Sequence, residues 1–267
     1  ANAGQIAVDL GATLALEGGA IDGGTLSIDG TLELEGLGIV KNGTLHSDGT
    51  IDVSGSGNEI DNEKATNLGA LEILAAGALL IGLGSSVDNK DGTIAIDNTA
   101  ALTVNDATIT DGTVTNKSGG TLDLTGTAAL KNGSLGNSGA INVSGAGNVL
   151  DHETVTNTSA AGIDVTGALL LDDGTMITGG TLTIGIAGTL EVSSDFGATL
   201  SGVAVGSSGN ILVDAQSTLV LSGASVTGGS LTDHGTIQVQ GVSTIDGATV
   251  INDGGELSAG LASTLDL

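Results

Sequence analysis

The chain repeats one pattern of short segments along its whole length, and this repetition constrains the fold more than any other feature. Four stretches share the order strand, small turn, strand, Gly-Gly or Asp-Gly, strand, Gly, strand. They are ATLALEGGAIDGGTLSIDGTLEL from Ala12, AALTVNDATITDGTVTNKSGGTLDL from Ala100, ALLLDDGTMITGGTLTIGIAGTLEV from Ala168 and STLVLSGASVTGGSLTDHGTIQVQ from Ser217. Because repetition of this kind is typical of stacked architectures, each copy is expected to pack on its neighbours.

Apolar and polar residues alternate within each copy. In residues 25–34, Leu26, Ile28, Leu32 and Leu34 are predicted to point one way and Ser27, Asp29 and Glu33 the other. This period of two is typical of strands with one buried face. No segment keeps a helical period, and the 47 glycines are too frequent for long helices. The sequence therefore predicts an all-β protein.

Two all-β architectures fit this pattern. Asp-Gly and Asn-Gly between strands are typical of hairpins, so an antiparallel β-sandwich or meander is one interpretation. A sandwich of this size normally fills its core with aromatic residues, but the chain has one Phe and no Trp or Tyr. We therefore predict a parallel β-solenoid (β-helix), right-handed, with about 20 residues per coil. Its roughly thirteen coils, at ~4.8 Å each, would form a rod of about 60 Å.

The repeats also predict the domain organisation. No polar linker or Pro-rich tract interrupts the chain, so residues 1–267 are predicted to form a single continuous repeat domain. The sequence opens inside a repeat and closes on the first strand of another copy. We therefore expect it to be a fragment of a longer chain.

The charge of the chain excludes some classes of partner. The net charge is −26, and the only basic residues are five lysines, none beyond Lys131. A phosphate backbone or an anionic lipid surface would be repelled, so we expect no nucleic-acid partner. No window is apolar enough to insert into a membrane, and the first residues do not resemble a signal peptide. With no Cys, the chain can form no disulfide.

One polar stretch occurs twice. SGSGNEIDNEKATN (Ser54–Asn67) is echoed ninety positions later by SGAGNVLDHETVTN (Ser144–Asn157). Carboxylates two residues apart on one strand face are candidate calcium ligands, and those of this echoed stretch are Asp61, Glu63, Asp151 and Glu153. The alternative is a corner whose carboxylates are solvated and whose Asn side chains cap turn amides. The glycine-rich calcium nonapeptide G-G-x-G-x-D-x-U-x does not match either copy. Calcium is thus the only cofactor that we consider.

No motif predicts catalysis. His46, His152 and His234 each have an acidic residue within two positions, but no pair has metal-ligand spacing. The chain has no G-x-S-x-G elbow, and its Gly-Ser runs lack the Lys of a phosphate-binding loop. We therefore predict no catalytic residue and no enzymatic activity.

The runs GSGNEIDNEKATN, GAGNVLDHETVTN and STLVLSGASVTGGSL resemble the β-strand-repeat regions of large secreted surface proteins of Gram-negative bacteria. These are adhesin-like or RTX-type proteins and autotransporter passengers. The resemblance implies a structural or adhesive rod at the cell surface, in a calcium-rich extracellular setting, and it transfers no catalytic residue. It does not identify an adhesion target. Unprotected coil ends also predict head-to-tail self-association.

Two other functions are weighed beside this one. Many polysaccharide lyases and epimerases are parallel β-helices, but such enzymes need cations and aromatic platforms that this chain nearly lacks. An ice-binding solenoid needs a regular Thr ladder. Thr-x-Thr occurs at residues 108–110, 113–115, 154–156 and 181–183, which does not place the motif once per coil.

Overall fold

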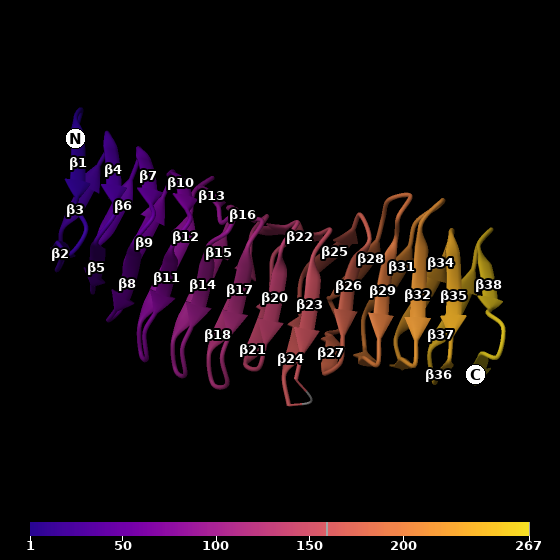
Figure 1. The fold of residues 1–267 in the computed structure, drawn as a ribbon. Helices are drawn as coiled ribbons and strands as arrows, with labels where there is room; N and C mark the ends of the chain where they lie inside the picture. The colour runs from indigo at the N-terminus through magenta and orange to yellow at the C-terminus, as the bar shows by residue number, and fades with distance from the viewer. Residues whose placement is uncertain (159, 267) are drawn as a thin grey trace. The chain divides into compact units, whose positions relative to one another are not determined.

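The computed structural model describes residues 1–158 and 160–266, and these residues form 39 strands and no helix (Figure 1). Contacts divide the chain into two compact units, Ala1–Ala140 and Ile141–Leu267, which are described one at a time. In both units, three short strands complete one coil of the chain.

In the first unit, every third strand belongs to the same sheet, which gives three sheets. Sheet A contains β1 (Gln5–Val8), β4 (Thr25–Ile28), β7 (Thr44–Ser47), β10 (Lys64–Asn67), β13 (Ser86–Asp88), β16 (Thr108–Thr110) and β19 (Ala129–Lys131). Sheet B contains β2 (Thr13–Leu16), β5 (Thr31–Glu35), β8 (Thr50–Ser54), β11 (Ala70–Ile73), β14 (Thr93–Ile96), β17 (Thr113–Asn116) and β20 (Ser134–Asn137). Sheet C contains β3 (Ala20–Asp22), β6 (Ile39–Lys41), β9 (Asn58–Asp61), β12 (Ala78–Gly82), β15 (Ala101–Asn105) and β18 (Thr121–Thr125). Strand β21 (Ala140–Val143) begins where this unit ends.

The second unit repeats the arrangement. Its sheet A strands are β22 (Asn148–Asp151), β25 (Ala168–Asp172), β28 (Thr189–Val192), β31 (Asn210–Val213), β34 (Ser230–Asp233) and β37 (Thr249–Asn252). Its sheet B strands are β23 (Thr154–Asn157), β26 (Thr175–Thr178), β29 (Ala198–Ser201), β32 (Thr218–Ser222), β35 (Thr236–Gln240) and β38 (Glu256–Ala259). Its sheet C strands are β24 (Gly162–Val165), β27 (Thr181–Ile184), β30 (Ala204–Ser207), β33 (Ser225–Thr227), β36 (Val242–Asp246) and β39 (Thr264–Asp266).

The strands pair in parallel, each with the strand one coil away. Thr13 pairs with Thr31 and Leu16 with Leu34 where β2 meets β5, and Thr189 pairs with Asn210 where β28 meets β31. The prediction of an all-β parallel β-solenoid with about 20 residues per coil is therefore confirmed, with about thirteen turns. The antiparallel sandwich or meander is wrong, because its neighbouring strands would run in opposite directions. Handedness and the single continuous domain stay predictions.

Stacked aliphatic side chains fill the inside of each coil. The alternation predicts that four residues of the second coil are buried, and each is at most 1% exposed: Leu26, Ile28, Leu32 and Leu34. Each of these side chains lies over a counterpart one coil away, for example Leu26 over Leu45 in sheet A and Leu34 over Val53 in sheet B. Burying one such side chain contributes roughly 1.5–3 kcal/mol, so the repeated columns account for most of the stability of a coil.

Backbones of successive coils come very close at the corner between sheets A and B. A Cβ atom on Gly69 would lie 1.9 Å from the carbonyl oxygen of Gly49, and one on Gly49 would lie 2.1 Å from that of Gly30. Neither Gly49 nor Gly69 has a positive φ. Space, rather than a left-handed conformation, therefore requires glycine at this corner.

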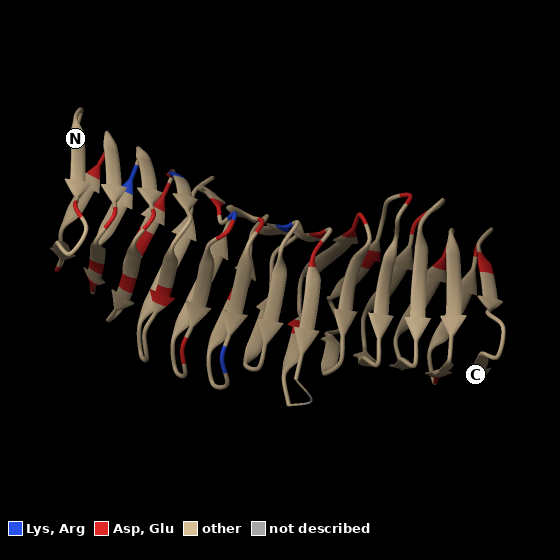
Figure 2. Cartoon of the chain, viewed as in Figure 1, with Lys and Arg blue, Asp and Glu red and all other residues tan. Residues whose placement is uncertain are grey.

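The two units differ in charge. All five lysines lie in the first unit, whereas acidic residues occur in both (Figure 2). Within the described part of the chain, no helix is long and apolar enough to cross a membrane.

Candidate functional site

The echoed polar stretch forms a strand, a tight corner and a second strand in both units. In the first copy, β9 ends at Asp61 and β10 begins at Lys64. The corner residue Asn62 has a φ of 47°, and its counterpart His152 has a φ of 52°. Asn and His are among the non-glycine residues that adopt this left-handed conformation most readily. The exchange of Asn for His between the two copies therefore preserves the corner.

Asn58 ties three successive coils together. Its side chain is only 1% exposed. Its Oδ1 accepts a hydrogen bond from the amide of Gly38 in the preceding coil at 3.1 Å. Its Nδ2 donates to the carbonyl of Ser54 in its own coil at 2.9 Å and to that of Ala78 in the next coil at 3.2 Å. A buried amide with its donor and acceptor both used is a structural element.

Glu63 makes a similar connection. Its carboxylate is 3% exposed and accepts a hydrogen bond from the amide of Gly43, one coil earlier, at 2.8 Å. Its own amide donates to Ser85 Oγ, one coil later, at 3.1 Å. Burial raises the pKa of the Glu63 carboxyl above its ordinary value, and the hydrogen bond from Gly43 opposes that rise.

The second copy repeats these contacts in the second unit. Asn148 Nδ2 donates to the carbonyl of Ser144 at 2.7 Å and to that of Ala168 at 3.3 Å. Glu153 is 2% exposed, and its amide donates to Thr175 Oγ1 at 3.1 Å. Two of the positions that the copies share, Asn58/Asn148 and Glu63/Glu153, therefore connect coils in both units.

The structure separates the two carboxylates of each predicted calcium pair. Asp61 and Asp151 are half-buried at the ends of β9 and β22, on the outer side of the strand, whereas Glu63 and Glu153 are buried. Among the residues that the structure describes, no three His, Asp or Glu side chains are grouped so that they could hold a metal ion. Calcium binding at Asp61, Glu63, Asp151 and Glu153 stays a prediction.

A column of carboxylates runs up the outer face of sheet B in the first unit. Glu33 pairs with Asp52, and Asp52 pairs with Glu72, on β5, β8 and β11. Partial burial raises the pKa of Asp52, and the charges of Glu72 and Glu33 raise it further. Asp52, the middle acid of the column, therefore holds its proton more strongly than an isolated aspartate would.

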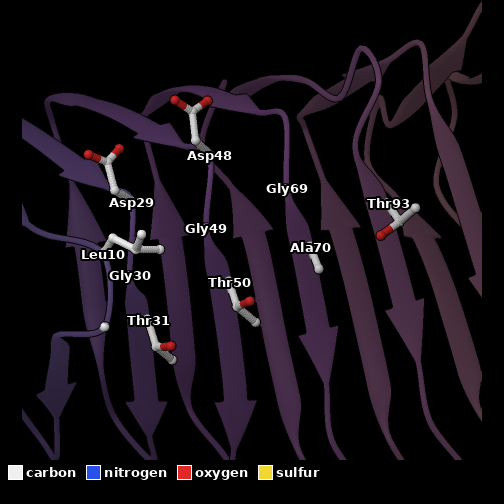
Figure 3. Close-up of a pocket in the computed structure, with 11 residues that line it drawn as sticks. Leu10, Asp29, Gly30, Thr31, Asp48, Gly49, Thr50, Gly69, Ala70 and Thr93 are labelled. Atoms are coloured by element: carbon white, nitrogen blue, oxygen red, sulfur yellow. The ribbon is translucent and has the colours of Figure 1, made fainter.

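A groove of about 550 Å³ lies beside this column (Figure 3). Gly30, Gly49 and Gly69 line it, with Asp29 and Asp48 along one side. Hydroxyl-bearing residues line it as well, and these belong to a column that runs Thr13, Thr31, Thr50, Ala70, Thr93, Thr113, Ser134 in register. A groove of this composition favours hydrogen-bond donors and cations.

The Thr-x-Thr pattern does not identify this column, because the column has at most one Thr per coil. The position two residues later on the same face carries Glu33, Asp52 or Glu72 in the central coils. The surface in these coils therefore has a row of Thr31, Thr50 and Ala70 beside a row of carboxylates.

The three histidines lie apart in the fold. His46 Nε2 is 3.4 Å from Asp48 Oδ1, and His234 Nε2 is 3.8 Å from Asp253 Oδ2. His152 Nδ1 instead donates to the backbone carbonyl of Asp173 at 2.9 Å. Each histidine thus has its own local partner.

Among known proteins, several solved structures are similar to this chain. The crystal structure of the TibC-catalyzed hyper-glycosylated TibA55-350 fragment is similar to this chain, with a TM-score of 0.40 and 16% sequence identity. The match covers 99% of this chain and 100% of that chain. No protein-family model matches the chain, and no match is found among the curated proteins. A likeness at this identity and TM-score transfers no function.

Proposed function

We propose that this chain is a non-catalytic structural or adhesive segment of an extracellular bacterial surface protein, serving as a stalk, surface layer or filament building block. One observation carries the proposal. In both copies of the echoed stretch, the buried polar side chains are used to connect one coil to the next, as Asn58 does between Gly38 and Ala78. Glu63 and Glu153 of the same stretch also bond to neighbouring coils, through the Glu63 carboxylate and both backbone amides.

Parallel pairing between coils gives this scaffold its mechanical character. Each strand bonds through its backbone to the strands one coil before and after it, as β8 does to β5 and β11. Separating two coils therefore breaks three strand pairings together with the aliphatic contacts beneath them. Such a segment resists extension while it remains folded.

The composition supports an extracellular location. A chain without Cys needs no disulfide and can be exported unfolded. Its net charge of −26 keeps neighbouring surfaces apart and the chain soluble. The resemblance of the repeats to secreted surface proteins agrees with both features.

Self-association is part of the same proposal. Parallel coils pair edge to edge, so the edge strands of one coil can accept those of a second copy of this chain head to tail. Because both partners are acidic, this association should strengthen with salt. Sedimentation velocity at 20 and 500 mM NaCl tests this expectation, and monomers under both conditions would contradict it.

Single-molecule pulling tests the mechanical function. With the chain held by its termini, we expect unfolding in steps of about 70 Å, or multiples of it, because a coil of about 20 residues extends by ~3.5 Å per residue. Extension at low force without discrete steps would contradict a mechanical role.

A further inference from the structure

One exposed aromatic residue of the second unit, Phe196, has no role in the scaffold proposed above. Phe196 is the single Phe, Tyr or Trp of the chain, and its side chain is 77% exposed. It lies between β28 and β29 and lines a cavity of about 320 Å³ with His152, Asp173 and Gly174. Because Phe196 is exposed at a cavity and not packed in the core, its ring is accessible to a ligand.

Three successive coils build this cavity. His152 follows β22, Asp173 and Gly174 follow β25, and Phe196 follows β28. The His152 ring is held by its hydrogen bond to the Asp173 carbonyl. Gly174 has a φ of 81° and donates its amide to the Gly197 carbonyl at 2.8 Å. A Cβ atom on Gly174 would lie 3.8 Å from the Phe196 Cβ, so glycine leaves the space beside the ring open.

The backbone of Asp173 is fixed in the same way. Its amide is bound by Asp172 Oδ1 at 2.9 Å and by Ser194 Oγ at 3.0 Å. Asp173 therefore lines the cavity from a corner whose conformation is set before any ligand arrives. Preorganisation of this kind lowers the cost of binding.

The charge around the cavity selects its ligand. Asp173 lines the cavity, and Asp172 and Asp195 are the sequence neighbours of its lining residues Asp173 and Phe196. Two further acids lie on or after nearby sheet A strands, Glu191 on β28 and Asp214 directly after β31. Burial raises the pKa of Glu191, and the neighbouring Asp214 raises it further. No Lys or Arg follows Lys131 in the sequence, so the unit supplies no cation of its own. An aromatic face beside uncompensated carboxylates attracts a positively charged group.

We propose that this cavity binds a lysine or arginine side chain from a basic segment of a partner polypeptide. The alkyl stem or guanidinium plane of that side chain lies against the Phe196 ring, and its charge is directed toward Asp173 and Asp195. The inference goes beyond the proposed structural function and does not depend on it.

The single phenylalanine makes the test direct, because its ring signals stand alone beside those of three histidines in the aromatic NMR spectrum. The probe is acetyl-Gly-Lys-Gly-amide, with the arginine peptide in a second titration and the norleucine peptide as an uncharged control, all at constant ionic strength. We expect saturable shifts of the Phe196 and His152 rings with the two basic peptides and none with norleucine. Equal shifts with all three peptides, or none with the basic ones, would overturn the proposal.

Two variants separate this cavity from diffuse attraction to an acidic surface. Phe196→Leu should weaken binding of the lysine peptide about fivefold, the contribution of one exposed cation–π contact. Its binding is followed through the His152 ring. The control is Ile186→Ala, which removes an exposed side chain (87%) from another turn of the same unit and should leave affinity unchanged. Equal affinity in both variants would overturn the proposal.

Discussion

Replacing Asn58 with alanine removes a side chain that bridges three coils. The substitution removes the acceptor of the Gly38 amide at 3.1 Å and the two N–H donors that Nδ2 shares among the carbonyls of Ser54, Gly55 and Ala78 at 2.9, 3.3 and 3.2 Å. Each bond contributes a net ~0.5–1.5 kcal/mol, and the longer bonds lie at the low end of that range. The free energy of unfolding should therefore fall by about 3 kcal/mol.

Urea unfolding followed by far-UV circular dichroism at 25 °C measures this loss. Asn148→Ala repeats the test in the second unit, where the echoed side chain makes corresponding bonds to Ser144 and Ala168. Asn210→Ala is the matched control, because Asn210 is exposed at the start of β31 and its loss should change stability by less than ~0.5 kcal/mol. If Asn58→Ala is as stable as the control, the bridging role assigned to the echoed stretch is wrong.

Three further predictions follow from the same geometry. Burial raises the pKa of the Glu63 and Asp233 carboxyls above the ordinary values of 4.5 for Glu and 3.8 for Asp. As the pH falls from 7, the folded chain therefore takes up protons before the unfolded chain does. The melting temperature should rise as the pH approaches those ordinary values. Gly69→Ala should cost at least ~2 kcal/mol in urea unfolding, because its Cβ would lie 1.9 Å from the Gly49 carbonyl oxygen. Millimolar calcium, compared with excess EDTA, should leave the melting temperature unchanged if Glu63 is a structural residue.

Each of these measurements has its own control. Glu63→Gln keeps an acceptor for the Gly43 amide and should flatten the pH dependence, so an unchanged profile would refute the assignment to Glu63. Gly136→Ala should be nearly neutral, since no atom lies within 4 Å of the new Cβ, and equal losses at both glycines would rule out the steric explanation for Gly69. A large rise of the melting temperature in calcium would instead support the predicted calcium sites at Asp61, Glu63, Asp151 and Glu153.

Alternation and repetition were sufficient to predict the strands and the direction of their side chains. Leu26 and Leu32 are buried and Asp29 is exposed, as a period of two requires. The hairpin signal was misleading, because Asn42-Gly43 turns the chain from one sheet to another. Asn42 has a φ of 59°, the left-handed conformation that such turn residues adopt in hairpins and in solenoid corners alike.

The candidate site was harder to predict for a related reason. The two-residue period of a strand predicted that the Asp61 and Glu63 side chains lie on one face. Asn62 between them is left-handed, so the chain changes direction there and the Glu63 side chain points inward. The cavity at Phe196 also has no sequence signature, because its residues come from three coils. The lengths of the turns decide which turn residues of successive coils lie side by side. A repeat pattern alone does not give those positions.

Amide hydrogen exchange at Gly38 and Gly43 tests most directly the claim that the echoed stretch holds coils together. Both glycines lie in turns, yet their amides are bound by buried side chains, Asn58 Oδ1 and Glu63 Oε2. We predict that both amides exchange as slowly as the strand amides of β8 and β9, and that Asn58→Ala exposes Gly38 selectively. Exchange of both amides at the rate of unprotected turns in the unsubstituted chain would contradict the account.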